Sequence, residues 1–188
     1  MSVHFLLVRF FRDAPERVQR AFALHLAKQA LLYLHASLSN SLEWARDRKD
    51  KRGVALIRKT ASTVEKLMPV HSPEDAGEVL EFLGSLDASL VGHVFESTEN
   101  TISYVSSAIF AVHGILLGIS PMPQKMESLS EGLLLIAEGE EDDVDAGLKE
   151  EASQLDWIRR NWHDAKTTPD VLADVDAYIA DGLLLGDE

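Results

Sequence analysis

The stretch AFALHLAKQALLYLHASL, from Ala21 to Leu38, decides the fold. Within it Leu24, Leu31 and Leu38 recur every seven residues, and this spacing returns to one face of a helix. Lys28 is the only charged side chain in the stretch, so apolar residues cover more than one helical face. Such a helix is typical of the interior of a bundle. We therefore expect a central helix that begins near the cap-like residues 13–16 and ends at about Leu38.

Helix signals continue on both sides of this stretch, whereas strand signals are nearly absent. Ser39-Asn40-Ser41 suggests a helix end, and Ser72-Pro73-Glu74-Asp75 is the clearest helix start because a serine cap precedes a proline and two carboxylates. Further helices are expected from about 41 or 52 to 68, from 72 to about 90, over about 98–117, 129–136 and 148–162, and from Thr168 onward. The prediction is an all-α single domain over residues 1–188, a bundle of seven or eight helices around the central apolar helix, with a possible accessory helix at 168–185.

Composition limits the class of protein. The chain has 188 residues, of which 46% are hydrophobic and 26% charged, and this size and balance predict one folded globular domain. It has no cysteine, which excludes disulfides, thiolate metal sites and cysteine nucleophiles. The uncharged segment 100–124 is diluted by Ser and Thr and broken by Pro121 and Pro123, so we expect a buried helix there and no membrane span. The first residues lack an export signal, and we expect a cytoplasmic protein.

Charge is divided unequally along the chain. Residues 1–66 hold 13 Lys and Arg against 6 Asp and Glu, whereas residues 67–188 hold 5 against 25, for a net charge of -13. The later part should present a negative surface, which disfavours nucleic acid and favours a basic protein partner. The basic cluster at 46–52 is interleaved with Asp47 and Asp50, and we interpret it as a solvated face.

The candidate partner contacts are acidic or aromatic. Asp170, Asp174 and Asp181 share one side of the predicted last helix because their spacings of four and seven return to one face. The remaining candidates are Trp157 and the acidic loop residues Glu140, Glu141, Asp142 and Asp143. A solvated face is the alternative interpretation of the carboxylates, and packing within the fold is the alternative for Trp157.

No recognised catalytic motif is present, and the sequence predicts neither a metal site nor a cofactor. The acidic run around Asp143 fails as a calcium loop because Gly147 and Leu148 stand where an oxygen ligand and a glycine are needed. The nearest approach to chemistry is a set comprising Asp87, His93, Glu96 and Glu99, with His93 and Glu96 expected on one helix face. An exposed polar helix face explains the same residues without chemistry.

Several local strings resemble those of the YjaG-like family of small bacterial all-helical proteins of unknown function. The similar strings are Ala21-Phe22, Leu26-Ala27 and Tyr33, then Leu86-Asp87-Ala88, Thr101 to Val105, and Asp156-Trp157. The resemblance would cover about residues 15–163. The chain lacks that family's tyrosine- and arginine-rich opening of the second long helix, and its helix from Thr168 is extra. The resemblance implies an all-helical fold and no reaction.

These observations favour a non-enzymatic binding module whose acidic helical surface engages a basic protein. The most concrete version is a bacterial immunity protein that neutralises a cognate toxin domain. A metal- or small-molecule-dependent hydrolase with a site at Asp87, His93, Glu96 and Glu99 is the alternative function. A self-associating helical protein, such as a homodimer, is a third interpretation.

Overall fold

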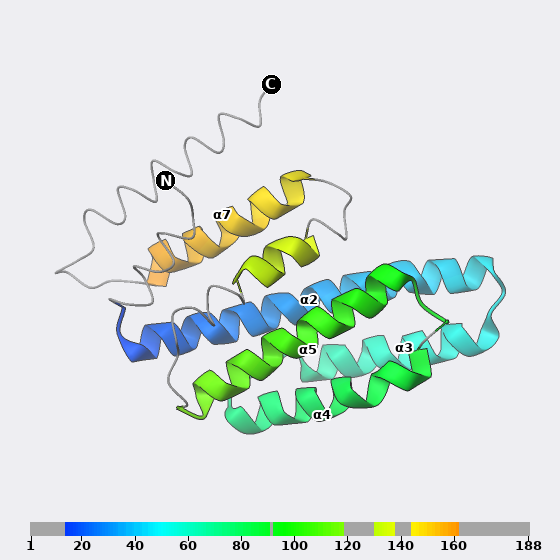
Figure 1. The fold of residues 1–188 in the computed structure, drawn as a ribbon, viewed down its shortest axis with the longest axis horizontal. Coiled ribbons are helices and arrows are strands. Elements are labelled where there is room, and N and C mark those ends of the chain that lie inside the picture. Colours follow the sequence, from blue (N-terminus) through cyan, green and yellow to red (C-terminus); the bar gives the residue numbers. More distant parts are fainter. Residues whose placement is uncertain (1–13, 91, 119–129, 138–143, 162–188) are drawn as a thin grey trace. The chain divides into compact units, whose positions relative to one another are not determined.

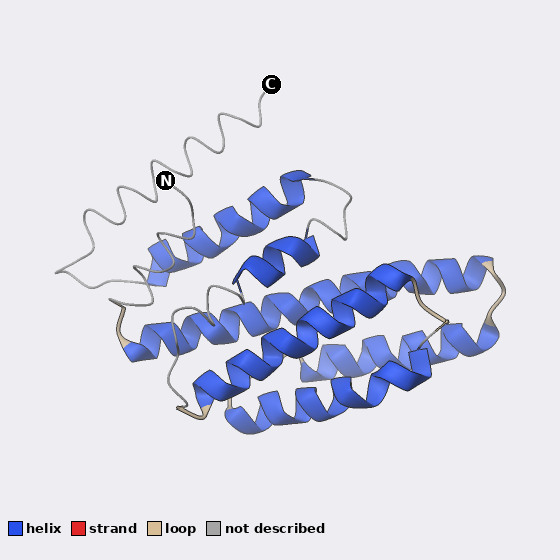
Figure 2. Cartoon of the chain, viewed as in Figure 1, coloured by secondary structure: helices blue, strands red, loops and turns tan. Residues whose placement is uncertain are grey.

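The computed structural model describes residues 14–90, 92–118, 130–137 and 144–161. Within these ranges the chain forms six helical segments and no strand, which confirms the all-α prediction (Figure 2). The segments are α2 (Glu16–Asp47), α3 (Lys51–Leu67), α4 (Pro73–Leu90), α5 (Glu96–Leu116), residues 130–137 and α7 (Val144–Asn161). The predicted accessory helix at 168–185 lies outside the described residues.

The first long helix is longer than predicted. The expected end at Ser39-Asn40-Ser41 is wrong, because α2 continues to Asp47. Ser37 and Ser41 are buried, and the Oγ1 of Thr98 in α5 lies 2.8 Å from both serine hydroxyls. The Thr98 hydroxyl therefore satisfies both serine hydroxyls. Serine often ends a helix because its hydroxyl bonds to nearby backbone groups, and here the hydroxyls have a partner on another helix instead.

The turn between α2 and α3 is short and strained at one residue. Lys49 has a left-handed φ of 58°, and Asp50 then accepts a hydrogen bond from the backbone N–H of Gly53 at 2.9 Å. This N-cap satisfies one of the free N–H groups at the start of α3. The helix begins at Lys51, close to the later of the two predicted starts.

The predicted start of α4 is confirmed. The hydroxyl of Ser72 accepts from the N–H of Asp75 at 3.2 Å, and the Asp75 carboxylate accepts from the N–H of Ser72 at 3.0 Å. This reciprocal pairing is a capping box, and Pro73 occupies the first helical position. Gly84 does not interrupt the helix, which runs to Leu90.

The described contacts divide the chain into two compact units, and each is treated by itself. One unit is Leu24–Ser120, and the other combines Met1–Ala23 with Pro121–Glu188. The boundary at residues 23 and 24 falls inside α2 (Figure 1). The single domain inferred from chain length stays a prediction.

In the unit Leu24–Ser120, α4 packs against both α3 and α5. Its core includes fully or almost fully buried side chains from four helices: Leu31, Leu34, Leu38, Ile57, Val64, Val79, Leu83, Val105, Ile109 and Val112. In the other unit Leu133, Ile136, Leu155 and Ile158 are buried. The buried residues of α4 and α5 recur at helical spacing, so each of these helices turns one apolar face toward the interior.

A search of the described helices finds none that is both long enough and apolar enough to span a membrane.

Candidate functional site

Most of the predicted partner contacts cannot be placed. Asp170, Asp174 and Asp181, together with the loop residues 140–143, lie outside the described residues. Trp157 is described on α7, where it is half-buried and its ring lies 5.1 Å from that of Phe22. One side of this tryptophan thus packs within its own unit, and its role in partner binding stays a prediction.

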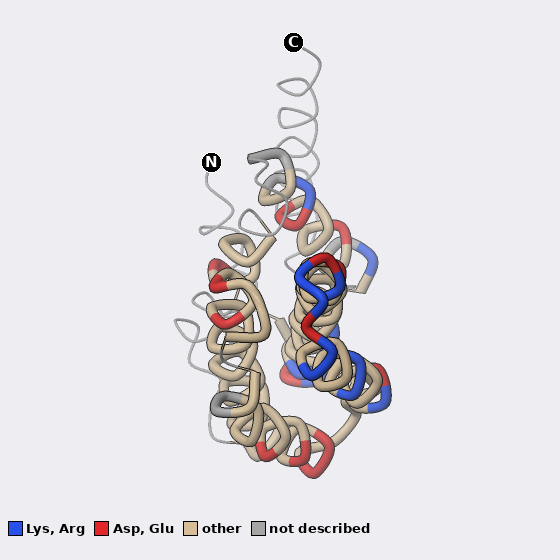
Figure 3. Tube along the Cα trace, turned by 90° about the vertical axis from the view of Figure 1, so that its right-hand side faces the viewer, with Lys and Arg blue, Asp and Glu red and all other residues tan. Residues whose placement is uncertain are grey.

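The α4–α5 hairpin carries charge of one sign only. From Met68 to Gly118 the sequence has no Lys or Arg. The carboxylates of this segment are Glu74, Asp75, Glu78, Glu81, Asp87, Glu96 and Glu99. Figure 3 shows red positions on this hairpin, while blue positions follow α2 and α3. The unit Leu24–Ser120 therefore has an acidic pair of helices, α4 and α5, beside the basic helix α3.

Helix α5 exposes large apolar side chains. Tyr104 is 48% exposed, Phe110 69% and Leu117, just beyond the helix end, 54%. The uncharged composition of this segment predicted a buried helix, and these exposed residues were not expected. Tyr104 and Phe110 fall between the positions of the buried stripe Ile102, Val105, Ile109 and Val112, and this offset is the signal that would have identified these two residues. Exposed aromatic residues are typical of a protein-binding surface.

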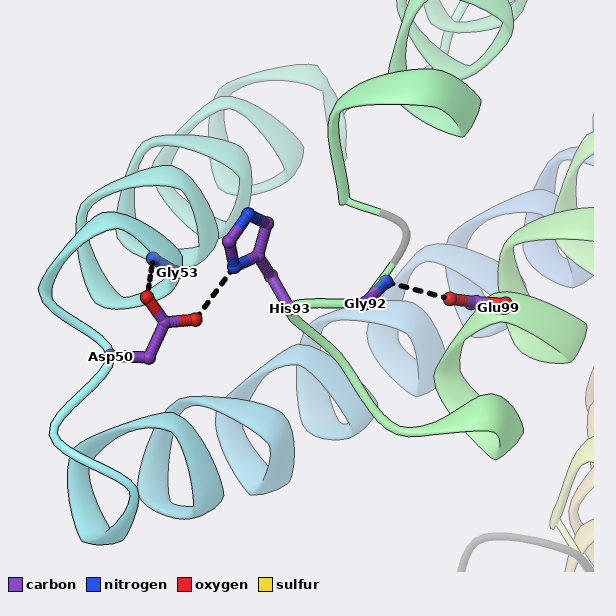
Figure 4. A network of polar contacts seen from close by, with 5 residues as sticks. All are labelled: Asp50, Gly53, Gly92, His93 and Glu99. Atoms are coloured by element: carbon purple, nitrogen blue, oxygen red, sulfur yellow. Dashed lines mark hydrogen bonds and ion pairs between the residues drawn. The ribbon is translucent and has the colours of Figure 1, made fainter.

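The residues of the alternative site are arranged differently from the prediction. The expected shared helix face of His93 and Glu96 is wrong, because His93 lies in the turn before α5. Its Nδ1 is 2.6 Å from Oδ2 of Asp50 (Figure 4). Glu99 accepts a long hydrogen bond of 3.4 Å from the N–H of Gly92. The side chain of Asp87 is outside the described part of the structure.

Asp50 is the centre of this polar cluster. The Gly53 N–H and, next, the His93 side chain lower the pKa of the Asp50 carboxyl. A Cβ at residue 53 would collide with the carboxylate of Asp50 and lie 3.2 Å from Nδ1 of His93, so these side chains would have to shift to accept any residue other than glycine. The cluster thus joins the α2–α3 turn to the α4–α5 turn. Sequence reasoning missed Asp50, although an aspartate just before a helix is an ordinary cap signal.

An aromatic pair stands next to this cluster. The rings of Trp44 and Phe95 are 4.9 Å apart, and the guanidinium of Arg48 lies 4.3 Å above the Trp44 ring. The backbone N–H of Phe95 also donates to Ser41 at 3.1 Å. These contacts hold the start of α5 against α2.

The cluster offers limited chemistry. A carboxylate bound to one imidazole nitrogen orients the ring and makes the other nitrogen a better base. Among the described residues, no group of three or more His, Asp and Glu side chains is arranged to hold a metal ion. The Asp50–His93 contact joins the start of α3 to the turn before α5.

No protein-family model matches this chain, and neither a curated protein nor a solved structure is significantly similar to it.

Proposed function

We propose that this chain is a non-catalytic binding module that engages a basic protein through an acidic helical surface. The observation that carries the proposal is the exposure of Tyr104, Phe110 and Leu117 on a hairpin whose described residues include carboxylates and no Lys or Arg. A few exposed aromatic anchors supply most of the binding energy in many interfaces. Surrounding charge of one sign accelerates encounter with a partner of the opposite sign and rejects others.

The most concrete form of this function is a bacterial immunity protein, which acts in the cytoplasm by binding and blocking a toxin domain. Such a role needs a rigid scaffold, a charged surface and a few anchors, and it needs no reaction. The resemblance to the YjaG-like helical proteins is compatible with it. The predicted seventh or eighth helix at 168–185 would add Asp170, Asp174 and Asp181 as a second acidic face.

The test is affinity capture from the native organism at low salt, with matched surface variants. Phe110→Ser removes the most exposed aromatic side chain among the described residues, and Leu32→Ser, at a residue 39% exposed on α2, is the control. We expect wild type and Leu32→Ser to recover one basic protein in stoichiometric amount. Phe110→Ser should weaken that binding about tenfold or more, since hot-spot truncations cost about 2 kcal/mol or more. Absence of any stoichiometric partner counts against the proposal.

The alternative is a hydrolase around Asp87, His93, Glu96 and Glu99. The observation in its favour is the Asp50–His93 contact, because it orients the imidazole as in many general bases. Elemental analysis of the purified chain separates the two functions. A tightly bound stoichiometric metal would favour the hydrolase, and a metal-free chain that binds a basic protein would favour the binding module.

A further inference from the structure

Helix α3 is basic along its outward side. Its buried residues are Gly53, Ile57, Thr60 and Val64, so it packs one face inward. Its exposed cations, which we call the basic face of α3, are Lys51, Arg52, Arg58, Lys59 and Lys66. Glu65 is the single acidic residue of this helix, and its carboxylate lies 3.0 Å from Nε2 of His35.

Helix α4 has the opposite pattern. It contains no Lys or Arg, and Glu74, Glu78 and Glu81 are exposed at spacings of four and three, which places them on one side of the helix. We call these three residues the acidic face of α4. Since α3 and α4 pack against each other and run antiparallel (Figure 1), a basic and an acidic helix of 17 and 18 residues lie next to each other.

The charged residues of the two helices lie at matching positions along the helix axes. Lys66 is one residue from the end of α3, and Glu74 is one residue after the start of α4. Lys59 and Glu81 are each eight residues from the same two ends, which is about 12 Å along either helix axis. In the described part of the chain none of these four side chains forms an ion pair. The two lysines and the two glutamates therefore lie at the same positions along the helix axes, and in the described part of the chain they are exposed and form no ion pair.

This pattern is self-complementary under a twofold rotation. We propose that two copies of the chain associate about a twofold axis parallel to α3 and α4, with the basic face of α3 in each copy over the acidic face of α4 in the other. Such a rotation keeps every residue at its own height along the axis. It brings Lys66 of one copy opposite Glu74 of the other and Lys59 opposite Glu81, and each pair occurs twice. A closed twofold interface requires this kind of self-complementary patch.

The expected dimer is weak and sensitive to salt, because exposed ion pairs contribute little and are screened. At about 0.1 M salt the Debye length of about 10 Å screens the distant acidic residues of the two copies but leaves close pairs attractive. Sedimentation velocity of the full chain should show a monomer–dimer equilibrium at about 0.1 M salt. At about 1 M salt the association constant should fall roughly tenfold or more, since there the Debye length is only about 3 Å.

Charge reversal tests the pairing itself. The double variant Lys59→Glu with Lys66→Glu, and the double variant Glu74→Lys with Glu81→Lys, should each be monomeric, because in each variant the side chains at the facing positions 59 and 81, and 66 and 74, carry charges of the same sign. An equimolar mixture of the two variants should dimerise. In one half of the interface the reversed α3 of the first variant meets the reversed α4 of the second, and in the other half the unchanged α4 of the first meets the unchanged α3 of the second, so opposite charges face each other in both halves. Circular dichroism and urea unfolding of each variant verify that it is folded.

A matched control makes the same change of net charge elsewhere. Lys28→Glu with Arg46→Glu reverses two exposed cations of α2 and should leave the association constant within about twofold, since those side chains lie outside the proposed faces. A chain that stays monomeric at all concentrations overturns the proposal. So does a dimer that neither double variant weakens, a mixture that fails to dimerise, or an assembly that grows beyond two copies. The proposal uses helices other than α5 and does not depend on the proposed function.

Discussion

Asp50 and His93 are 43 positions apart in the chain, and the Oδ2 of Asp50 lies 2.6 Å from the Nδ1 of His93. The same aspartate caps α3 through the N–H of Gly53. One short side chain therefore stabilises a helix start and also fastens the turn before α5 to it. Four predictions test this contact and others that hold the helices in place.

The first prediction concerns the glycine beneath this contact. Gly53→Ala introduces a Cβ into the space of the Asp50 carboxylate, so both the cap and the His93 contact must shift. Gly84→Ala is the control, because a Cβ there meets nothing within 4 Å in an exposed part of α4. The control should gain about 0.5–1 kcal/mol from helix propensity. Gly53→Ala should be less stable than the control by about 1–2 kcal/mol, the range for a lost cap. Equal urea midpoints for the two variants would contradict this.

The second prediction concerns pH. Burial, followed by the nearby charge of Lys28, lowers the pKa of His25 from 6.5. In the unfolded chain this histidine binds a proton below about pH 6.5, whereas in the folded chain it resists protonation to lower pH. Its contribution to stability is therefore present above pH 6.5 and declines as the pH falls toward the folded pKa. Urea unfolding between pH 7.5 and 5.5 should show a smaller loss of stability for His25→Gln than for wild type. An identical pH dependence in the two proteins would argue against a burial effect at His25.

The third prediction concerns the buried hydroxyls between α2 and α5. Thr98→Val keeps the shape of the side chain but leaves Ser37 and Ser41 without the hydroxyl that lies 2.8 Å from each. Loss of a buried hydrogen-bond partner costs about 1–3 kcal/mol. Ser107→Ala, at an exposed position of α5 where the hydroxyl bonds only to the Ser103 carbonyl, is the control and should change stability by less than about 0.5 kcal/mol. The free energy of unfolding from urea titration measures both. A Thr98→Val protein as stable as its control would mean that these hydroxyls are hydrated or rearranged.

The fourth prediction concerns Trp157. Its ring packs 5.1 Å from Phe22 and is half-buried, so Trp157→Ala should lower the free energy of unfolding by about 1–3 kcal/mol, below the cost of a fully buried aromatic residue. Trp157→Phe retains a ring and should lose less than half of that. If neither variant changes stability while both weaken partner binding, Trp157 is an exposed anchor and not a packing residue. Thermal unfolding followed by circular dichroism, alongside partner capture, separates these outcomes.

Parts of the candidate surfaces were visible in the sequence, and parts were not. The absence of Lys and Arg from Met68 to Gly118 and the basic cluster at 46–52 can be read directly from residue types. The exposure of Phe110 could not be concluded from its apolar segment alone. It depends on which face of α5 turns toward α4, and that is decided by packing.

Local chemistry determined the helical class, the start of α4 and the buried stripes of α4 and α5. The cap at Ser72 and Asp75 and the spacing of Val79, Leu83 and Leu86 involve residues within two turns of one another, so they can be recognised along the chain. Only the tertiary structure decided that α2 continues past Ser41 and that Asp50 meets His93. Those outcomes depend on partners 57 and 43 positions away, and such partners come together only when whole helices pack.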